Sequence, residues 1–397
     1  MKNNEIVLET IGEIDPALVP PLRRRAHPAV WAAAAAALIA LAVTLPHLGK
    51  TASASPYDRL PQTSLETRYA GETPLDPTLL PGTAGFEGMM AYDIAELQTP
   101  TPWDTAAITA LPVFRDRAYL AEGSATGMAL CLSETDMSQL ASDTAAALGI
   151  TVTKTETTYL RDFVQGGYTE AQLDSVYSVE AACEDGTQIT VYGDGKIRIT
   201  FDGLALPDKY HFTYDTTTPA EADAVLSYLT DRYAPLLGYG DAAWYSFADR
   251  TFDGVESRHY YAYDQSSDPV EALLAKELTC TQFAPDDAGR LLCIWLQDPY
   301  CTADYLGDYP IVTAAEAEAR LLEGAYQSSV PEEYLKGGTV SAEDIAWQTL
   351  VYREANGTLM PFYQFYVTLD TSAFVMPEGL QNFGIFYVPA VQEDLLT

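Results

Sequence analysis

Three consecutive arginines, Arg23, Arg24 and Arg25, precede an almost uninterrupted apolar run over residues 29–45. As a helix, these 17 residues would cover about 26 Å, slightly less than the roughly 30 Å of a bilayer's hydrocarbon core. Extending the helix by three residues, to residue 48, makes it long enough to cross this core. Arginines beside a membrane-spanning helix hold their end of the chain in the cytoplasm. The pattern therefore predicts a single crossing near the N-terminus.

The predicted membrane helix covers residues 29–48, with a cytoplasmic tail at 1–28 and all later residues outside the cytoplasm. Trp31 suits the cytoplasmic interface, where aromatic side chains concentrate. A cleavable signal peptide is the alternative, because residues 52–54 (Ala-Ser-Ala) fit an A-x-A cleavage site. Both interpretations predict that the bulk of the chain is extracytoplasmic.

The composition is strongly acidic, with 56 Asp and Glu against 22 Lys and Arg and a formal net charge of −34. Such a surface repels phosphate backbones and anionic lipid headgroups, so nucleic-acid binding is excluded as a function class. Basic proteins, cations and uncharged ligands are the partners that it favours. Alternatively, the net charge serves only to keep the protein soluble. An apolar content of 48% is enough for a folded core.

Five cysteines lie beyond the predicted membrane helix, so at least one is unpaired within the chain. Cys280 and Cys293 are equally far from the middle of a predicted turn at Asp286 and Asp287. A symmetric hairpin would place them opposite each other, in reach of a disulfide. Burial as small apolar side chains is the alternative. No C-x-x-C or Cys/His cluster occurs, and no metal or cofactor is expected.

Residues 49–112 are rich in Pro, Thr, Ser and Gly, which predicts an extended stalk with little regular structure. Its aromatic side chains suggest that part of it lies against the folded region. Beyond it, helix signals alternate with strand patterns. This predicts an α+β fold of three helix-plus-antiparallel-sheet units at 113–215, 216–308 and 309–397.

Four helices are predicted from N-terminal capping patterns, beginning after Ser133, Thr218, Asp268 and Thr313. The helix after Thr218 is expected to run to Gly238. Alternating apolar residues predict strands at 150–158, 177–183, 188–192, 197–201, 243–247, 258–263, 279–283, 291–297, 345–353, 362–369 and 383–388. Residues 193–195 (Gly-Asp-Gly) predict a hairpin turn.

The last unit contains three motifs that are similar to those of a known family. It contains Tyr-Pro-Ile at 309–311, Met-Pro-Phe-Tyr-Gln-Phe-Tyr-Val at 360–367 and Phe-Tyr-Val-Pro-Ala at 386–390. These motifs resemble the C-terminal module of exported Firmicutes proteins of the YycI and PepSY-like type. The resemblance implies a helix packed across an antiparallel sheet and a regulatory or inhibitory role outside the membrane.

No catalytic motif of the G-x-S-x-G, H-E-x-x-H or Walker type occurs in the sequence. The only histidines beyond residue 48 are His211 and His259, and both are expected to be structural. Tyrosines in predicted strands form a candidate interaction surface, with core packing as the alternative. The candidates are Tyr260, Tyr261, Tyr263, Tyr363, Tyr366 and Tyr387.

The sequence therefore predicts a membrane-anchored extracytoplasmic protein that binds or regulates an envelope partner, such as a sensor kinase or a protease, without catalysis. A cell-wall hydrolase that uses acidic residues is the alternative. A deep pocket with converging carboxylates would favour the hydrolase, and a shallow exposed surface would favour the binding protein.

Overall fold

The structure is a computed structural model that describes residues 90–92, 95, 101, 105–116, 130–162, 169–250, 256–328, 330, 332–355, 357–370 and 379–396. The predicted cytoplasmic tail and membrane helix lie outside these residues, as do Arg23, Arg24, Arg25 and Trp31. Within the described part of the chain, no helix has both the length and the apolar character needed to cross a membrane.

The described helices are interspersed among the strands, several of which follow one another directly. The strands are β1 (Met90–Tyr92), β2 (Ala110–Asp116), β3 (Val152–Tyr159), β4 (Val176–Cys183), β5 (Gln188–Tyr192), β6 (Ile197–Leu204), β7 (Ala242–Arg250), β8 (Glu256–Asp264), β9 (Thr281–Pro285), β10 (Leu291–Leu296), β11 (Ala303–Pro310), β12 (Ile345–Ala355), β13 (Thr358–Thr368) and β14 (Gln381–Pro389). The α-helices are α5 (Glu134–Leu148), α6 (Glu170–Leu173), α7 (Pro219–Arg232), α8 (Ala234–Leu237), α9 (Pro269–Leu278) and α10 (Ala314–Leu322). Short 3-10 helices are η1 (Thr105–Ala107), η2 (Leu160–Asp162), η3 (Pro299–Cys301), η4 (Glu332–Tyr334), η5 (Lys336–Gly338), η6 (Ala342–Asp344) and η7 (Glu393–Leu395).

The fold is α+β, as predicted, and its strands pair in antiparallel fashion. They join one 14-stranded sheet in the order β11-β2-β13-β14-β1-β7-β8-β9-β10-β6-β5-β4-β3, with β12 paired to β13 off this path. Strands from all three predicted units therefore share one sheet. Two described segments of the predicted stalk, β1 and the start of β2, are interior strands of it.

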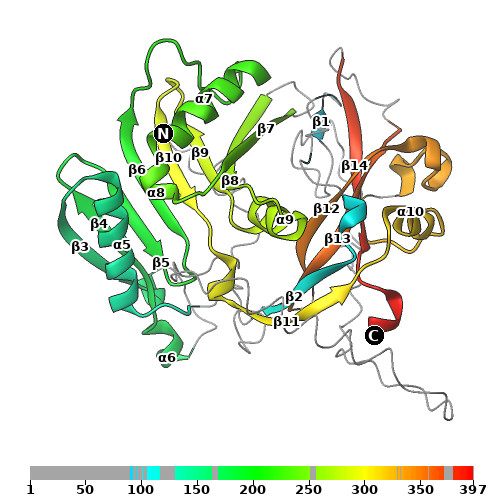
Figure 1. Ribbon diagram of the computed structural model, residues 1–397, viewed down its shortest axis with the longest axis horizontal. Coiled ribbons are helices and arrows are strands. Elements are labelled where there is room, and N and C mark those ends of the chain that lie inside the picture. The colour runs from blue at the N-terminus through cyan, green and yellow to red at the C-terminus, as the bar shows by residue number, and fades with distance from the viewer. Residues whose placement is uncertain are drawn as a thin grey trace.

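Two main hydrophobic cores divide the molecule into lobes (Figure 1). The first lobe comprises residues 130–296, and its core lies between α5 and α7 and the strands that they cover. The second lobe comprises residues 105–116 and 303–396, with a core that includes Phe365 and Phe386. Helix α9 connects the lobes, because it belongs to the first by sequence but places Leu273 and Leu278 in the core of the second.

The four predicted helices, α5, α7, α9 and α10, begin where the capping patterns indicate, whereas α6 was not predicted and α8 was not predicted as a separate helix. At α7 the Thr218 side chain accepts a hydrogen bond from the Glu221 amide, and the Glu221 carboxylate accepts one from the Thr218 amide. This arrangement satisfies amides that the first helical turn leaves unpaired. The predicted helix does not run unbroken to Gly238. It stops at Tyr233 and restarts as α8, because Pro235 has no amide hydrogen with which to continue the helix.

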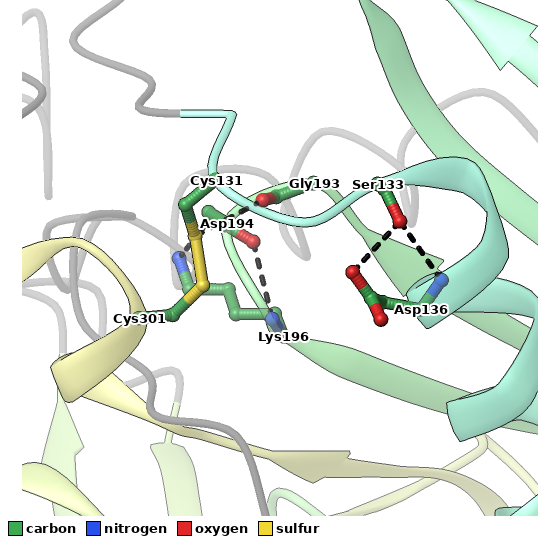
Figure 2. Close-up of a disulfide and its surroundings, with 7 residues drawn as sticks. All are labelled: Cys131, Ser133, Asp136, Gly193, Asp194, Lys196 and Cys301. Carbon is green, nitrogen blue, oxygen red and sulfur yellow. Dashed lines mark hydrogen bonds and ion pairs between the residues drawn. A yellow bond between two sulfur atoms is a disulfide. The ribbon is translucent and has the colours of Figure 1, made fainter.

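A disulfide between Cys131 and Cys301 joins the two places where the chain passes between lobes (Figure 2). The chain enters the first lobe just before Cys131, whose amide donates to the Gly193 carbonyl at 2.8 Å. It leaves through η3, which ends at Cys301. The bond therefore closes a loop that contains every element of the first lobe.

The predicted Cys280–Cys293 disulfide is wrong, because both thiols are free and buried. The turn between β9 and β10 is not centred on Asp286 and Asp287, since the Asp286 amide donates to the Arg290 carbonyl. Cys293 consequently pairs with Ala284, and Cys280 lies before the first residue of β9. The alternative, burial as small apolar side chains, is confirmed.

Candidate functional site

For five of the six candidate tyrosines the interaction surface is wrong, and the alternative, core packing, is confirmed. Tyr260, Tyr261, Tyr263, Tyr363 and Tyr387 are all buried, and Tyr366 is half-buried with its ring stacked on Trp347. The sheet is covered on both faces at β8, so alternate tyrosines are buried on opposite sides. Tyr260 packs edge-on against Phe212 in the first core, while Tyr261 stacks on Tyr245 on the other face.

The two histidines lie in different environments. His259 is buried on β8 and stacks on Phe247 with ring centroids 4.8 Å apart. His211 is exposed, and its Nε2 lies 2.8 Å from the Thr216 hydroxyl oxygen in the turn before α7. Neither histidine lines the groove described next.

An open groove of about 350 Å³ lies on the first lobe between the end of β6, the C-terminal half of α7 and the start of β10. Its lining is mostly apolar or aromatic, with one cation and no carboxylate. The lining residues are Leu204, Ala205, Leu206, Pro207, Tyr228, Leu229, Arg232, Tyr233 and Leu291. We refer to it as the Leu206 groove.

Local backbone features form the wall of the Leu206 groove. Strand β6 bends at Gly203, whose φ of 64° favours glycine, and a Cβ there would lie 2.3 Å from Cζ of Arg290. After the strand, the Tyr210 amide donates to the Pro207 carbonyl at 2.9 Å. This turn stacks Tyr210 on Tyr228 of α7 with ring centroids 4.5 Å apart. The loop is thereby fixed against the helix.

One cation, Arg232, lines the Leu206 groove, and a second, Lys209, lies near it beside Tyr210, which stacks on the lining residue Tyr228. The Arg232 guanidinium lies 5.7 Å from the centroid of the Tyr233 ring, and Nζ of Lys209 lies 4.7 Å from that of Tyr210. Neither forms an ion pair within the described residues, whereas nearby Arg290 pairs with Asp286 at 2.6 Å. Burial raises the pKa of the Tyr233 hydroxyl, and Arg232 partly offsets this. The tyrosine therefore stays neutral at physiological pH.

A second, shallower depression of about 540 Å³ lies between α10 and the C-terminal residues and includes Glu316, Glu393 and Asp394. The Glu316 carboxylate accepts hydrogen bonds from the amide and hydroxyl of Thr313, which hold its pKa below the usual range. Glu316 is therefore an ionised helix cap. A carboxyl that donates a proton in catalysis needs a raised pKa instead.

Carboxyl groups with a raised pKa lie elsewhere. Burial raises the pKa of Asp298, which precedes η3, to about 8, and it raises those of Asp194 and Glu277. None of the three lines either depression. Among the described residues, no three His, Cys, Asp or Glu side chains come together as a metal site.

The sequence analysis missed the Leu206 groove. Its parts come from β6, α7 and β10, and no regular spacing in the sequence connects them. The only local signal is that each cation directly precedes a tyrosine, Lys209 before Tyr210 and Arg232 before Tyr233.

Searches against protein-family models, curated proteins and solved structures give no match to this chain. The YycI and PepSY-like resemblance of residues 309–390 therefore remains a prediction from its motifs.

Proposed function

We propose that this protein is a membrane-anchored extracytoplasmic binding protein that regulates a neighbouring envelope protein, and that the Leu206 groove is its contact site. The observation that carries the proposal is the make-up of this groove. It combines apolar side chains with a cation and contains no carboxylate. Binding sites commonly combine apolar side chains with a small number of placed polar groups.

The extracytoplasmic location is supported by the Cys131–Cys301 disulfide. Disulfides persist in oxidising compartments and are rare in the cytoplasm of most cells. The basic-then-apolar sequence at residues 23–45 supports anchoring at the membrane. The three remaining cysteines are buried, which protects them from mispairing in such a compartment.

The alternative, a cell-wall hydrolase, has less support. Glycoside hydrolysis commonly needs two carboxyl groups that face each other across a substrate cleft. The Leu206 groove contains none. The second depression contains Glu316, Glu393 and Asp394, but it is shallow and the pKa of Glu316 is lowered. Asp298, with its raised pKa, lies outside both depressions.

Site-specific crosslinking in intact cells tests the proposal. A photoreactive amino acid at Leu206 should form an adduct with one envelope protein. At Tyr159, which is 38% exposed on edge strand β3, it should form none. The same adduct from both positions, or from neither, would contradict a contact site at the groove.

A parallel assay addresses the hydrolase. The full-length protein is incubated with isolated cell walls, and soluble glycan fragments are measured. We expect no release. Release that stops in an Asp298→Asn variant would establish the hydrolase instead.

A further inference from the structure

We propose that the Leu206 groove binds an extended peptide segment of its partner in which a large apolar side chain lies beside a single acidic residue. This inference rests on the proposed binding function and adds the chemistry of the ligand. The apolar side chain occupies the groove, and the carboxylate binds Arg232 with Lys209 nearby.

The partly buried leucines of the lining, Leu204 and Leu206, provide the apolar contact, and the residues beneath them make the groove rigid. Leu229 and Leu291 are buried in the first core, with 1% and 0% of their surface exposed, so they form a fixed floor. Leu206 is only partly buried and forms the wall. A volume of about 350 Å³ is at the lower end of the range for ligand sites. It suits a few side chains, whereas a lipid chain would need a longer, enclosed cavity.

The backbone of the wall favours an extended peptide. Ala205 and Leu206 follow the last residue of β6 and make no backbone–backbone hydrogen bond with any residue that the structure describes. Both residues line the groove. Their amide and carbonyl groups are therefore available to a second chain, and extended peptides commonly bind through such unpaired main-chain groups.

The cations select an acidic residue. In a chain of net charge −34, Arg232 lines the groove and Lys209 lies near it, and neither has an ion-pair partner in the described part of the protein. Arg232 is exposed and lies over the Tyr233 ring, and a guanidinium carries five N–H donors that can form paired hydrogen bonds with a carboxylate.

The surroundings limit how many acidic residues the ligand carries. Asp208 and Asp231 are exposed and each is adjacent in sequence to one of the two cations. Together with the net charge, they repel a polyacidic segment. A ligand with one carboxylate flanked by apolar residues is attracted by the cations and avoids this repulsion.

Peptide binding to the full-length protein tests this chemistry by titration calorimetry at low salt. The probe is acetyl-Gly-Ser-Leu-Glu-Phe-Ser-Gly-amide, whose blocked ends leave the Glu side chain as its only charge. Matched peptides replace Glu by Gln, or Leu and Phe by Ser. We expect binding of the first peptide, at least fivefold weaker binding with Gln, and loss of binding with Ser.

Variants of the protein locate the site. Arg232→Glu should weaken binding of the Glu peptide at least tenfold, and Arg232→Gln should weaken it less. Lys154→Glu makes the same charge change on edge strand β3 and is the matched control. It should leave binding unchanged. Equal loss in the control, or equal affinity for the Glu and Gln peptides, would overturn the acidic preference.

Two further outcomes separate this inference from the proposed function. If the Leu206 crosslink to the envelope partner persists in Arg232→Glu, the groove binds a partner but the charge inference is wrong. If no crosslink forms in any variant, the binding function itself fails. If the protein binds phosphatidylglycerol vesicles and none of the peptides, its ligand is a lipid and the peptide inference is wrong.

Discussion

Reduction of the Cys131–Cys301 disulfide should destabilise the first lobe. The bonded residues are 170 positions apart, and closing such a loop lowers the entropy of the unfolded chain by about 17 cal/mol/K in the chain-entropy model. This corresponds to ~5 kcal/mol at 25 °C, close to the upper end of measured disulfide contributions. The loss should appear in the first lobe because the loop encloses it.

Urea unfolding of the full-length protein with and without reductant measures this loss. With a slope of ~2 kcal/mol per molar urea, a loss of that size lowers the midpoint by about 2.5 M. The Cys131→Ser/Cys301→Ser double variant should unfold at the reduced midpoint and show no further change with reductant. Coinciding curves for oxidised and reduced wild type would refute the reasoning, as would five reactive thiols in the denatured, unreduced protein.

Two other predictions concern stability. Burial raises the folded pKa of Asp298 from 3.8 to about 8, so the folded state binds the extra proton and wild-type stability should fall as pH rises from 4 to 8. Asp298→Asn should remove this pH dependence of the unfolding free energy, which amounts to up to about 6 kcal/mol between pH 4 and pH 8. A wild-type stability that stays flat over this range in thermal melts would contradict the prediction. Phe365→Ala in the second core and Phe283→Ala in the first should each cost about 3 to 5 kcal/mol. Tryptophan fluorescence and circular dichroism will show one shared transition if the lobes unfold together, and the coupling through α9 is refuted if the transitions separate.

Local signals predicted the helices well. Ser133, Thr218, Asp268 and Thr313 are all N-caps, as predicted. These predictions held because a cap depends on residues within one turn of the helix. The hairpin turn at 193–195 likewise depends on its own glycines and links β5 to β6.

Long-range arrangement was not predictable in the same way. Strand β11 was missed altogether, and the first three residues of β2 were assigned to a stalk, although the two strands pair with each other over their full lengths. Their pairing brings together residues about 190 positions apart, which no local pattern encodes. The Cys131–Cys301 bond was missed for the same reason.

The candidate site shows a different limit. Alternation correctly placed Tyr260, Tyr261 and Tyr263 on a strand, but it could not show that helices cover both faces of the sheet there. The Leu206 groove depends on a loop that stacks Tyr210 on Tyr228, a contact between elements. A binding surface of this kind becomes visible only once the tertiary packing is known.

The position of β2 sets an order for biogenesis. This strand is made before the first lobe, yet its partners β11 and β13 are made after it. During synthesis from the N-terminus, residues 130–296 can therefore fold while residues 110–116 still wait for their neighbours. A chain truncated before β11 would expose β2 as an unpaired apolar strand, a ready target for chaperones and quality-control proteases.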